Sequence, residues 1–369
     1  MSVTLKDIAE KAGVSPITVS RALRGVGRIG QETRRRVWGT ATELGYQPVD
    51  YVIIPPPVKR GKADHSLQLL APSIGSQHYN ESGSLFLNRL FSGLNQRLRS
   101  SNGCVLMGHF DTVDDLIRTW KKHGYQGLIL RQQLPRSWIR ALQKIGPIVY
   151  AVEFDWQTGV DCVYSNELRS TADVLTEVYD RGHRSVAWLG VLDAYAPHQV
   201  VFSSNEKLEI ADYLANTTSH GGRLAAWAHL CNFPPPDMDC HLVVVERDWR
   251  NKNLSQTVEE GIERIMKIDP RVTAIVAASD PVAVEVLRQL QARGIKVPEE
   301  MSLISYGGGE DLLRVDPTPA SVQIPVETIG RVIPELIERR LAFPDATPVS
   351  IQFETVFDAG KTLATVPSA

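Results

Sequence analysis

The stretch VTLKDIAEKAGVSPITVSRALRG, residues 3–25, determines which fold the amino-terminal part of the chain can adopt. Its apolar residues recur at helical spacing between Leu5 and Ala12, and Gly13 can take the left-handed conformation that ends a helix. Ser15 can cap a second helix that starts at Pro16, because proline at the first helical position loses no hydrogen bond. A helix, a short turn and a second helix form the motif that inserts its second helix into the DNA major groove.

A third helix is predicted at residues 31–44, where apolar residues again form one stripe and Gly45 follows. It would close a small core, since two short crossed helices bury too little surface by themselves. The sequence therefore predicts a three-helix domain with a helix-turn-helix. Helical periodicity alone would also fit a small three-helix domain with another function.

The charge distribution adds a reason to expect a polyanionic partner. Residues 1–62 contain eleven Lys and Arg against five Asp and Glu, a net charge of +6, whereas the remaining residues carry −8. Neutralising DNA phosphates requires local positive charge, although a solvated basic face would have the same composition. The asymmetry is the pattern expected when only the first part of a chain meets a polyanion.

Together, VTLKDIAEKAGVSPITVSRALRG and QETRRRVWGTATELGYQP closely resemble the headpiece of the lactose-repressor (LacI) family of transcription regulators. The resemblance covers residues 3–48. It implies base contacts from Pro16, Ile17 and Arg21, and contacts mainly to phosphates from several hydroxyl side chains. Arg21 is the strongest candidate for reading sequence, because a guanidinium can pair with guanine through two hydrogen bonds. The DNA-binding positions that the resemblance implies are Thr4, Ser15, Pro16, Ile17, Thr18, Ser20, Arg21 and Arg24.

The linker expected at residues 49–66 contains DYVIIPPPVKRGK. Family members place here a short hinge helix that inserts a leucine into the minor groove, but three consecutive prolines forbid a continuous helix and favour an extended spacer. Ile53 or Ile54 could still act as the apolar wedge that kinks DNA. The alternative is a plain tether whose basic residues contact phosphates.

Residues 67–369 alternate short apolar runs with longer amphipathic stretches, which predicts βαβ units and mostly parallel sheets. Two series of such units predict two lobes, and small ligands usually bind at the carboxyl ends of strands in such folds. The strands are expected at 67–72, 104–110, 127–131, 147–152, 161–166, 186–190, 242–246, 274–279 and 303–307.

Segments such as RGHRSVAWLG and TAIVAASDPVAVEVLRQLQARGIKVPEEMSLISY resemble the family's regulatory domain, which is similar to periplasmic sugar-binding proteins. The resemblance implies a first lobe at about 67–190 plus 320–348, and a second lobe at about 194–318 plus a final strand pair near 349–360. It also implies a homodimer. A dimer fits the physical argument that one headpiece covers only half of a palindromic double-stranded operator.

The effector site is expected to be lined by polar and aromatic residues at strand ends: Tyr79, Asn166, Tyr195, Trp249, Asp280 and Tyr306. Several polar anchors of the family are missing. Ser279 replaces an asparagine, Gly307 an aspartate and Ile324 a glutamine, and an arginine expected after Tyr195 is absent. Because each buried sugar hydroxyl needs a partner, these losses argue against a typical monosaccharide as the effector.

Other functions find less support. The glycines of YGGGED match no phosphate-binding loop, and HLCNFPPPDMDCH has no common zinc spacing, so no cofactor and no metal site are predicted. No catalytic residue or enzymatic activity is predicted. Apolar runs are too short to cross a membrane and no secretory leader is seen, so the protein is expected in the cytoplasm.

The leading hypothesis is a DNA-binding regulator, most simply a repressor, whose body senses a small molecule. Two alternatives stay open. The chain could be a constitutive DNA-binding dimer without an effector, because the polar anchors of the effector site are missing. It could also be a small-molecule-binding protein of the same fold with a vestigial headpiece.

Overall fold

The computed structural model describes residues 4–23, 33, 36–37, 40, 67–74, 84–99, 103–110, 112–131, 134, 136–152, 154, 159–193, 221–247 and 253–366. The chain divides into two compact units, residues 1–53 and 54–369. The division falls inside the linker expected at 49–66.

The first unit contains helices α1 (Leu5–Ala12) and α2 (Pro16–Leu23). Thr33, Arg36, Val37 and Thr40, within the expected third helix, are helical as well. Val37 is fully buried against α1 and α2, so the third segment does close the miniature core. The buried residues of this core are Ile8, Ala9, Ala12, Val19, Ala22 and Val37.

The second unit has two six-stranded sheets, one in each lobe, as predicted. The described pairings are parallel except for one antiparallel pair at the edge of the second sheet. The first sheet has the order β11 (Ser350–Phe353), β5 (Asp161–Ser165), β4 (Ile148–Ala151), β3 (Gly127–Leu130), β1 (Gln68–Ile74) and β2 (Cys104–Phe110). The second has the order β12 (Val356–Asp358), β10 (Ala320–Gln323), β9 (Ser302–Gly307), β8 (Ala274–Ala277), β6 (Ser185–Asp193) and β7 (Asp239–Arg247).

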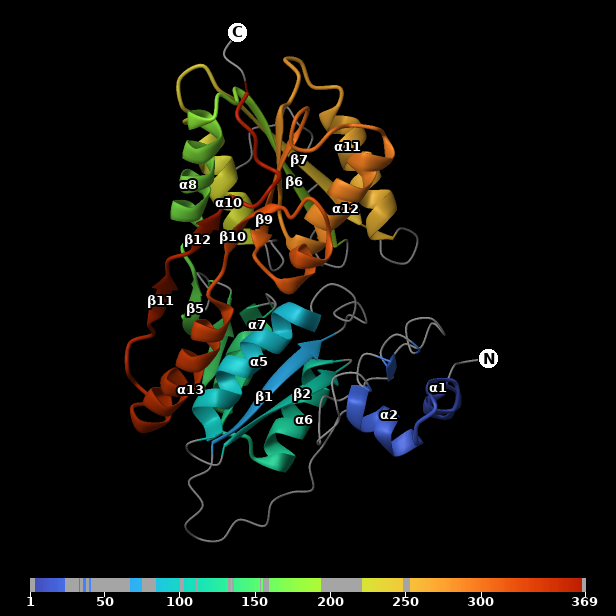
Figure 1. The fold of residues 1–369 in the computed structure, drawn as a ribbon. Coiled ribbons are helices and arrows are strands. Elements are labelled where there is room, and N and C mark those ends of the chain that lie inside the picture. The colour runs from blue at the N-terminus through green and yellow to red at the C-terminus, as the bar shows by residue number, and fades with distance from the viewer. Residues whose placement is uncertain are drawn as a thin grey trace. The chain divides into compact units, whose positions relative to one another are not determined.

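Helices cover both faces of each sheet (Figure 1). On the first sheet, α5 (Ser84–Leu98) and α13 (Val326–Ala342) pack on one face, and α6 (Val113–His123) and α7 (Arg136–Gln143) on the other. On the second sheet, α8 (Glu167–Asp180) and α10 (Gly221–Cys231) share one face, and α11 (Leu254–Ile265) and α12 (Asp280–Ala292) the other. A short 3-10 helix, η2 (Glu310–Arg314), follows β9.

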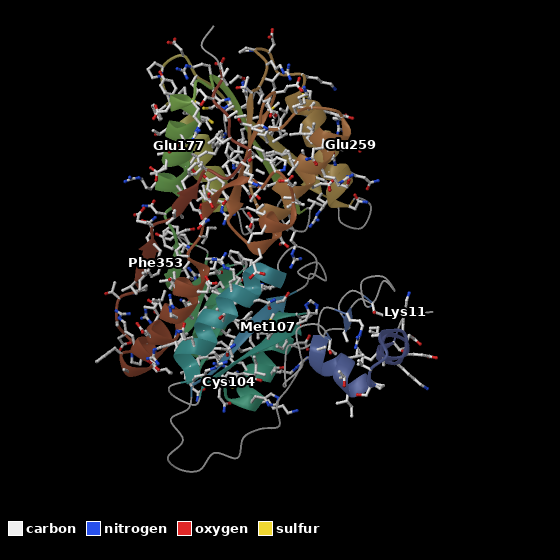
Figure 2. The ribbon with its side chains drawn as sticks, viewed as in Figure 1. Lys11, Cys104, Met107, Glu177, Glu259 and Phe353 are labelled. Carbon is white, nitrogen blue, oxygen red and sulfur yellow. The ribbon has the colours of Figure 1, made fainter. Side chains whose placement is uncertain are left out.

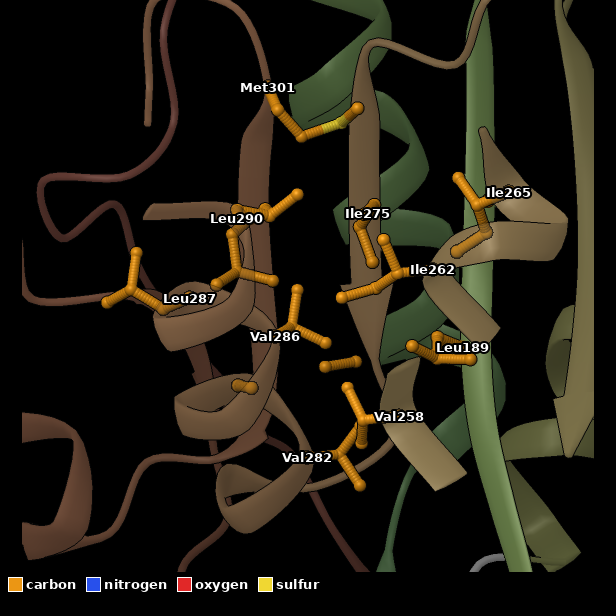
Figure 3. Close-up of a cluster of buried hydrophobic side chains, with 14 of the residues drawn as sticks. Leu189, Val258, Ile262, Ile265, Ile275, Val282, Val286, Leu287, Leu290 and Met301 are labelled. Atoms are coloured by element: carbon orange, nitrogen blue, oxygen red, sulfur yellow. The ribbon is translucent and has the colours of Figure 1, made fainter. Parts of the chain in front are cut away.

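Each sheet face has its own apolar core, because the strands are buried on both sides and therefore consist of apolar runs. Figure 3 shows the core between the second sheet and α11 and α12, where Ile262 and Val286 face Leu189 and Ile275. Figure 2 labels Cys104 and Met107 on the edge strand β2. The nine strands expected from the sequence correspond to β1 to β9.

The crossings between the lobes differ from the sequence expectation, which extended the first lobe to about residue 190. α8 follows β5 directly and packs its Val174 and Val178 into the second lobe, so the chain crosses just after Ser165. β6 belongs to the second sheet. Apolar periodicity shows which side of an element is buried, but it does not show which sheet buries it.

The carboxyl-terminal crossings need the same correction. Residues 320–323 were expected in the first lobe, yet they form β10 of the second sheet, and the chain returns to the first lobe only with α13. The expected final strand pair is not a pair. β11 joins the first sheet beside β5, and β12 joins the second beside β10. The chain therefore crosses between the lobes three times.

Candidate functional site

Local hydrogen bonds fix the start of α1 and the turn that follows its end. The Thr4 backbone N–H donates to the Asp7 carboxylate at 2.7 Å, and the Asp7 N–H donates back to the Thr4 hydroxyl at 3.4 Å, which caps α1. The hydrogen bond from Thr4 lowers the pKa of Asp7. Gly13 ends α1 with a φ of 65°, and the Val14 N–H donates to the Ala9 carbonyl at 3.0 Å.

α2 begins at Pro16 as the sequence predicts. The Thr18 N–H donates to the Ser15 hydroxyl at 3.1 Å, and the Ser15 and Thr18 hydroxyls share a hydrogen bond of 2.8 Å. Ser15 therefore caps the helix that is expected to enter the major groove. Both hydroxyls have a structural partner, so a contact to phosphate would come in addition to the capping role.

The exposed side of α2 carries the residues expected to contact bases. Pro16 is exposed and Ile17 has 64% of its surface exposed, whereas Val19 on the opposite side is fully buried. Thr4 is exposed, and Ser20 is half-buried. DNA contacts were also predicted for Arg21, Arg24, Ile53 and Ile54. The side chains of these four residues lie outside the described part of the structure.

A second group of predicted site residues lies at the carboxyl edge of the second sheet. Asp280 begins α12 just after β8, and its side chain is buried. Its carboxylate accepts hydrogen bonds from the Ser305 hydroxyl at 2.6 Å and from the N–H groups of Gly308 and Gly309 at 3.2 and 2.8 Å. Burial raises the pKa of Asp280, and these hydrogen bonds oppose that shift.

The three glycines of YGGGED, which we call the glycine loop (Gly307–Gly309), wrap around this carboxylate. Gly307 has a φ of 144°, and a Cβ built there would lie 2.4 Å from Asp280 Oδ2. Gly308 has a φ of 67°, and its Cβ would lie 2.8 Å from the Gln323 Cα. Only glycine fits at these positions. The glycine loop is therefore tightly packed and is not a general flexible connection.

Tyr306 was predicted to line the effector site, but its side chain points into the core. Its ring is 1% exposed and packs in the core of the second lobe against α8 and α10. Its hydroxyl shares a hydrogen bond of 2.8 Å with Thr171, and burial raises its pKa. Tyr306 thus stabilises the lobe from inside. An aromatic residue at a strand end does not by itself reveal which way it points.

Asn166 connects two of the three crossings. Its Oδ1 accepts from the Arg169 N–H at 3.1 Å and caps α8, while its Nδ2 donates to Glu354 at 3.0 Å. Its backbone N–H donates to the Phe353 carbonyl at 2.8 Å. Phe353 is labelled in Figure 2. The side-chain Nδ2 and the backbone N–H of Asn166 therefore join the crossing after β5 to the crossing between β11 and β12. Tyr79, Tyr195 and Trp249 lie outside the described residues.

Sequence reasoning missed Arg223, in the first turn of α10. Its guanidinium donates to the Ala278 carbonyl at 2.8 Å, pairs with Glu167 at 3.4 Å and lies 5.5 Å from the Tyr306 ring centroid. Arg223 therefore lies next to the carboxyl ends of β8 and β9. The signal available in the sequence was an arginine inside the apolar helix GGRLAAWAHL.

Arg223 and Glu167 form a largely buried ion pair, with side chains 8% and 15% exposed. Glu167 also accepts from the Ser165 hydroxyl at 2.6 Å. Paired charges at this depth are costly to separate, because each would remain buried without its partner. The carboxyl edge therefore contains a fixed cation, two carboxylates and the peptide groups of the glycine loop.

A cavity of about 330 Å³ lies at the opposite, amino edge of the first sheet, beside Ile148 and Val160. Its charged residues are engaged with each other. Arg340 donates to both carboxylate oxygens of the fully buried Asp161 at 3.1 and 2.8 Å, and the Val349 N–H donates to the same carboxylate at 2.8 Å. This cavity was not predicted from the sequence, and its polar groups serve to attach α13 to β5.

The two histidines of HLCNFPPPDMDCH, the segment considered for zinc binding, contact other side chains. The His229 and Phe233 rings are tilted by 55° with centroids 5.5 Å apart, and His241 Nε2 lies 3.3 Å from the Ser185 hydroxyl. In the described ranges, no group of three or more His, Cys, Asp or Glu is placed to hold a metal ion. Among the same residues, each helix is too short or too polar to span a bilayer.

Two family profiles match the chain. The one described as bacterial regulatory proteins, lacI family, matches residues 4–49. The one described as a periplasmic binding protein-like domain matches residues 175–358. The first match coincides with the helix-turn-helix, and the second covers most of the second lobe together with α13 and β11 of the first.

Curated relatives span nearly the whole chain. The HTH-type transcriptional regulator GntR of Pseudomonas aeruginosa is 28% identical over 343 residues, which cover 89% of this chain and 86% of the relative. The HTH-type transcriptional repressor CytR of Escherichia coli is 24% identical, covering 89% and 87%. Catabolite control protein A of Priestia megaterium is 24% identical, covering 92% of each chain.

Solved structures share the fold. The regulator CelR in complex with cellobiose matches with a TM-score of 0.60 and 20% identity, covering 98% of this chain and 99% of that one. The lac repressor dimer bound to operator and the anti-inducer ONPF matches with a TM-score of 0.59 and 19% identity, covering 99% and 100%. A regulator from Enterococcus faecium with bound ribose matches with a TM-score of 0.60 and 15% identity, covering 81% and 99%.

Proposed function

Because this chain belongs to the LacI family of bacterial regulatory proteins, it is a DNA-binding transcriptional regulator, and we propose that it represses transcription as a homodimer on a palindromic operator. The observation that supports operator recognition is the exposed side of α2, where Pro16 and Ile17 face outward from a buried core. A dimer places two such helices on two half-sites. The protein would act in the cytoplasm, where the operator DNA is.

Arg21→Ala tests sequence recognition. We expect the variant to lose ~1–3 kcal/mol of discrimination between operator and random DNA, because a bidentate contact to guanine contributes about that much. Fluorescence anisotropy on DNA from around its own gene, at fixed salt, measures both affinities. Arg169→Ala removes an exposed arginine paired with Asp173 in the body, and this control should bind like wild type. Equal affinity of the wild type for operator and random DNA would contradict the proposal.

We further propose that the carboxyl edge of the second sheet binds the effector, and that the effector is not a typical monosaccharide. Asn166, Tyr306 and Asp280 were the described candidates for binding sugar hydroxyls. Each has its side-chain polar groups engaged within the protein. A ligand rich in hydroxyls would have to break these bonds, and a buried group left without a partner costs ~1–3 kcal/mol. Tyr79, Tyr195 and Trp249, the remaining candidates, are aromatic and suit an apolar or flat ligand.

A thermal-shift screen tests the effector class. Glucose and ribose should leave the melting temperature unchanged, whereas planar ligands with few hydroxyls, with adenine and benzoate as probes, should raise it. A ligand at a hundredfold excess over its Kd adds ~2.7 kcal/mol to stability, which such a screen detects. If only the monosaccharides stabilise the protein, the proposed effector class is wrong.

A constitutive DNA-binding dimer is the second candidate function. The observation that favours it is the same internal engagement of Asp280, Asn166 and Tyr306, since a site without a ligand has no need of free polar groups. Operator binding that is unchanged by cell extract fractions and by every member of the ligand panel would favour this function over effector control.

A further inference from the structure

Helices α5 and α13 of the first lobe touch backbone to backbone. A Cβ on Gly93 of α5 would lie 2.0 Å from the Glu327 carbonyl oxygen, and one on Gly330 of α13 would lie 2.3 Å from the Leu90 carbonyl oxygen. Such close contact requires glycine on both helices. The two helices, side by side in Figure 1, therefore form a rigid base, and their ends near residues 89 and 327 are held in fixed positions.

Arg89 lies one turn before Gly93 and pairs with the first turn of α13. Its Nε and Nη2 donate to the two carboxylate oxygens of Glu327 at 2.9 and 3.1 Å. This bidentate pair is the stronger kind of ion pair because the planar guanidinium matches the carboxylate. The hydrogen bond from Arg89 lowers the pKa of Glu327. The guanidinium is thereby oriented by residues of the first lobe alone.

The oriented guanidinium also reaches the second lobe. Its Nη2 donates to the Ile324 carbonyl at 3.4 Å, in the segment that crosses from β10 to α13. Its Nη1 donates to the Gly308 carbonyl at 3.3 Å, in the glycine loop. Both distances are longer than those to Glu327. The bonds to the second lobe and to the crossing would therefore break first, while the pair with Glu327 remains.

Gly308 forms hydrogen bonds with residues of both lobes. Its N–H donates to Asp280 of the second lobe, and its carbonyl accepts from Arg89 of the first. The loop has little room to move, since the Gln323 Cα would lie 2.8 Å from a Cβ on Gly308. If the lobes separate, Arg89 leaves the carbonyl and the glycine loop keeps only its contacts within the second lobe.

We propose that Arg89 is a positioning residue that holds the glycine loop from the first lobe and so couples the shape of the effector edge to the arrangement of the two lobes. This inference rests on the proposed effector site at that edge. An effector that displaces the Gly308 carbonyl would release Arg89, and one that presses the loop toward α5 would tighten the contact. The loop thereby reports ligand occupancy to the first lobe, through the Arg89–Glu327 pair.

Hydrogen exchange on the full-length protein without any ligand tests the proposal. In Arg89→Ala, the Gly308 and Gly309 amides should exchange roughly fivefold faster, because losing one hydrogen bond makes local opening easier by about that factor. Arg89→Lys should keep a charge pair with Glu327 and a near-normal melting temperature, yet show the same faster exchange, since a single ammonium cannot serve both partners. A purely structural role would instead be rescued by lysine.

Arg97→Ala is the matched control. Arg97 lies on the same helix and pairs with Glu335 and Glu338 of α13 at 3.4 and 2.8 Å, so it also joins α5 to α13. This variant should leave exchange in the glycine loop unchanged. Wild-type exchange in Arg89→Ala, or equally fast exchange in Arg97→Ala, would overturn the proposal.

Operator binding separates this inference from the proposed function. The exchange experiment needs neither DNA nor effector, so unchanged loop exchange in a protein that still binds its operator would reject only the role of Arg89. A wild-type protein that fails to discriminate operator from random DNA would reject the proposed function, whatever the loop does.

Discussion

The Asp280 carboxylate fills the space that a side chain at position 307 would need. A Cβ on Gly307 would lie 2.4 Å from Asp280 Oδ2, and the φ of 144° is one that residues with a side chain rarely adopt. Gly307→Ala should therefore destabilise the protein by ~2 kcal/mol or more, from backbone strain plus displacement of the carboxylate. Chemical denaturation measures the loss.

A double-mutant cycle separates the steric clash with the Asp280 carboxylate from the backbone strain at Gly307. Asp280→Ala removes the carboxylate, so the double variant should be more stable than the sum of the single losses predicts, by ~0.5–3 kcal/mol. Gly294→Ala shows the cost of a positive φ without a collision, since Gly294 has a φ of 73° and nothing within 4 Å of its Cβ position. Strict additivity would show that the carboxylate can move aside without cost.

For single residues, the sequence predicted the place in an element better than the bonding partners. Asp280 and Asn166 were expected to line the effector site; Asp280 begins α12 and Asn166 caps α8, and their contact with an effector stays a prediction. Their bonding partners were not predictable, because Ser305, Gly308 and Glu354 are distant along the chain. Arg223 was missed for a similar reason: its contact with the Ala278 carbonyl joins residues 55 positions apart.

Among the elements, the pair α5 and α13 depends most on single residues. Gly93→Ala would place a methyl group 2.0 Å from the Glu327 carbonyl oxygen, so the helices must separate. We expect a loss of ~1–3 kcal/mol in unfolding free energy, the usual cost of overpacking a core. The same shift should loosen the Arg89–Glu327 pair, so loop exchange should also rise.

Ser92→Ala provides the comparison one residue earlier on the exposed side of α5. An exposed substitution of this kind should stay within ~0.5 kcal/mol of wild type, since it touches no packed surface. Denaturant midpoints of the two variants, measured side by side, decide the matter. Equal stability of Gly93→Ala and wild type would mean that the helix contact is softer than the geometry indicates.

Elements whose signals are local were predicted most closely. Gly13, Ser15 and Pro16 specify the ends of α1 and α2 within four residues of sequence, and both helices form at those positions. The buried strands were also predicted, because apolar runs of four to seven residues rich in β-branched residues are too short for a typical buried helix. The strand β10 lacks such a run and was not assigned separately.

For the whole molecule, the fold class and family membership were predictable, but the division into lobes was not. Each lobe is assembled from segments far apart along the chain, and the amphipathic pattern of α8 or β6 is the same whichever sheet covers it. Only the pairing of strands, with β6 between β7 and β8, assigns these elements to the second lobe. Non-local pairing is the information that a single sequence does not display.

β11 and β12 lie two residues apart, yet each completes the edge of a different sheet. The second lobe is therefore not a continuous piece of the gene. Exchanging it with that of a relative by recombination would require three junctions, after β5, before α13 and between β11 and β12. The headpiece, by contrast, is encoded by one uninterrupted segment, so its exchange leaves the strand pairing of both sheets untouched.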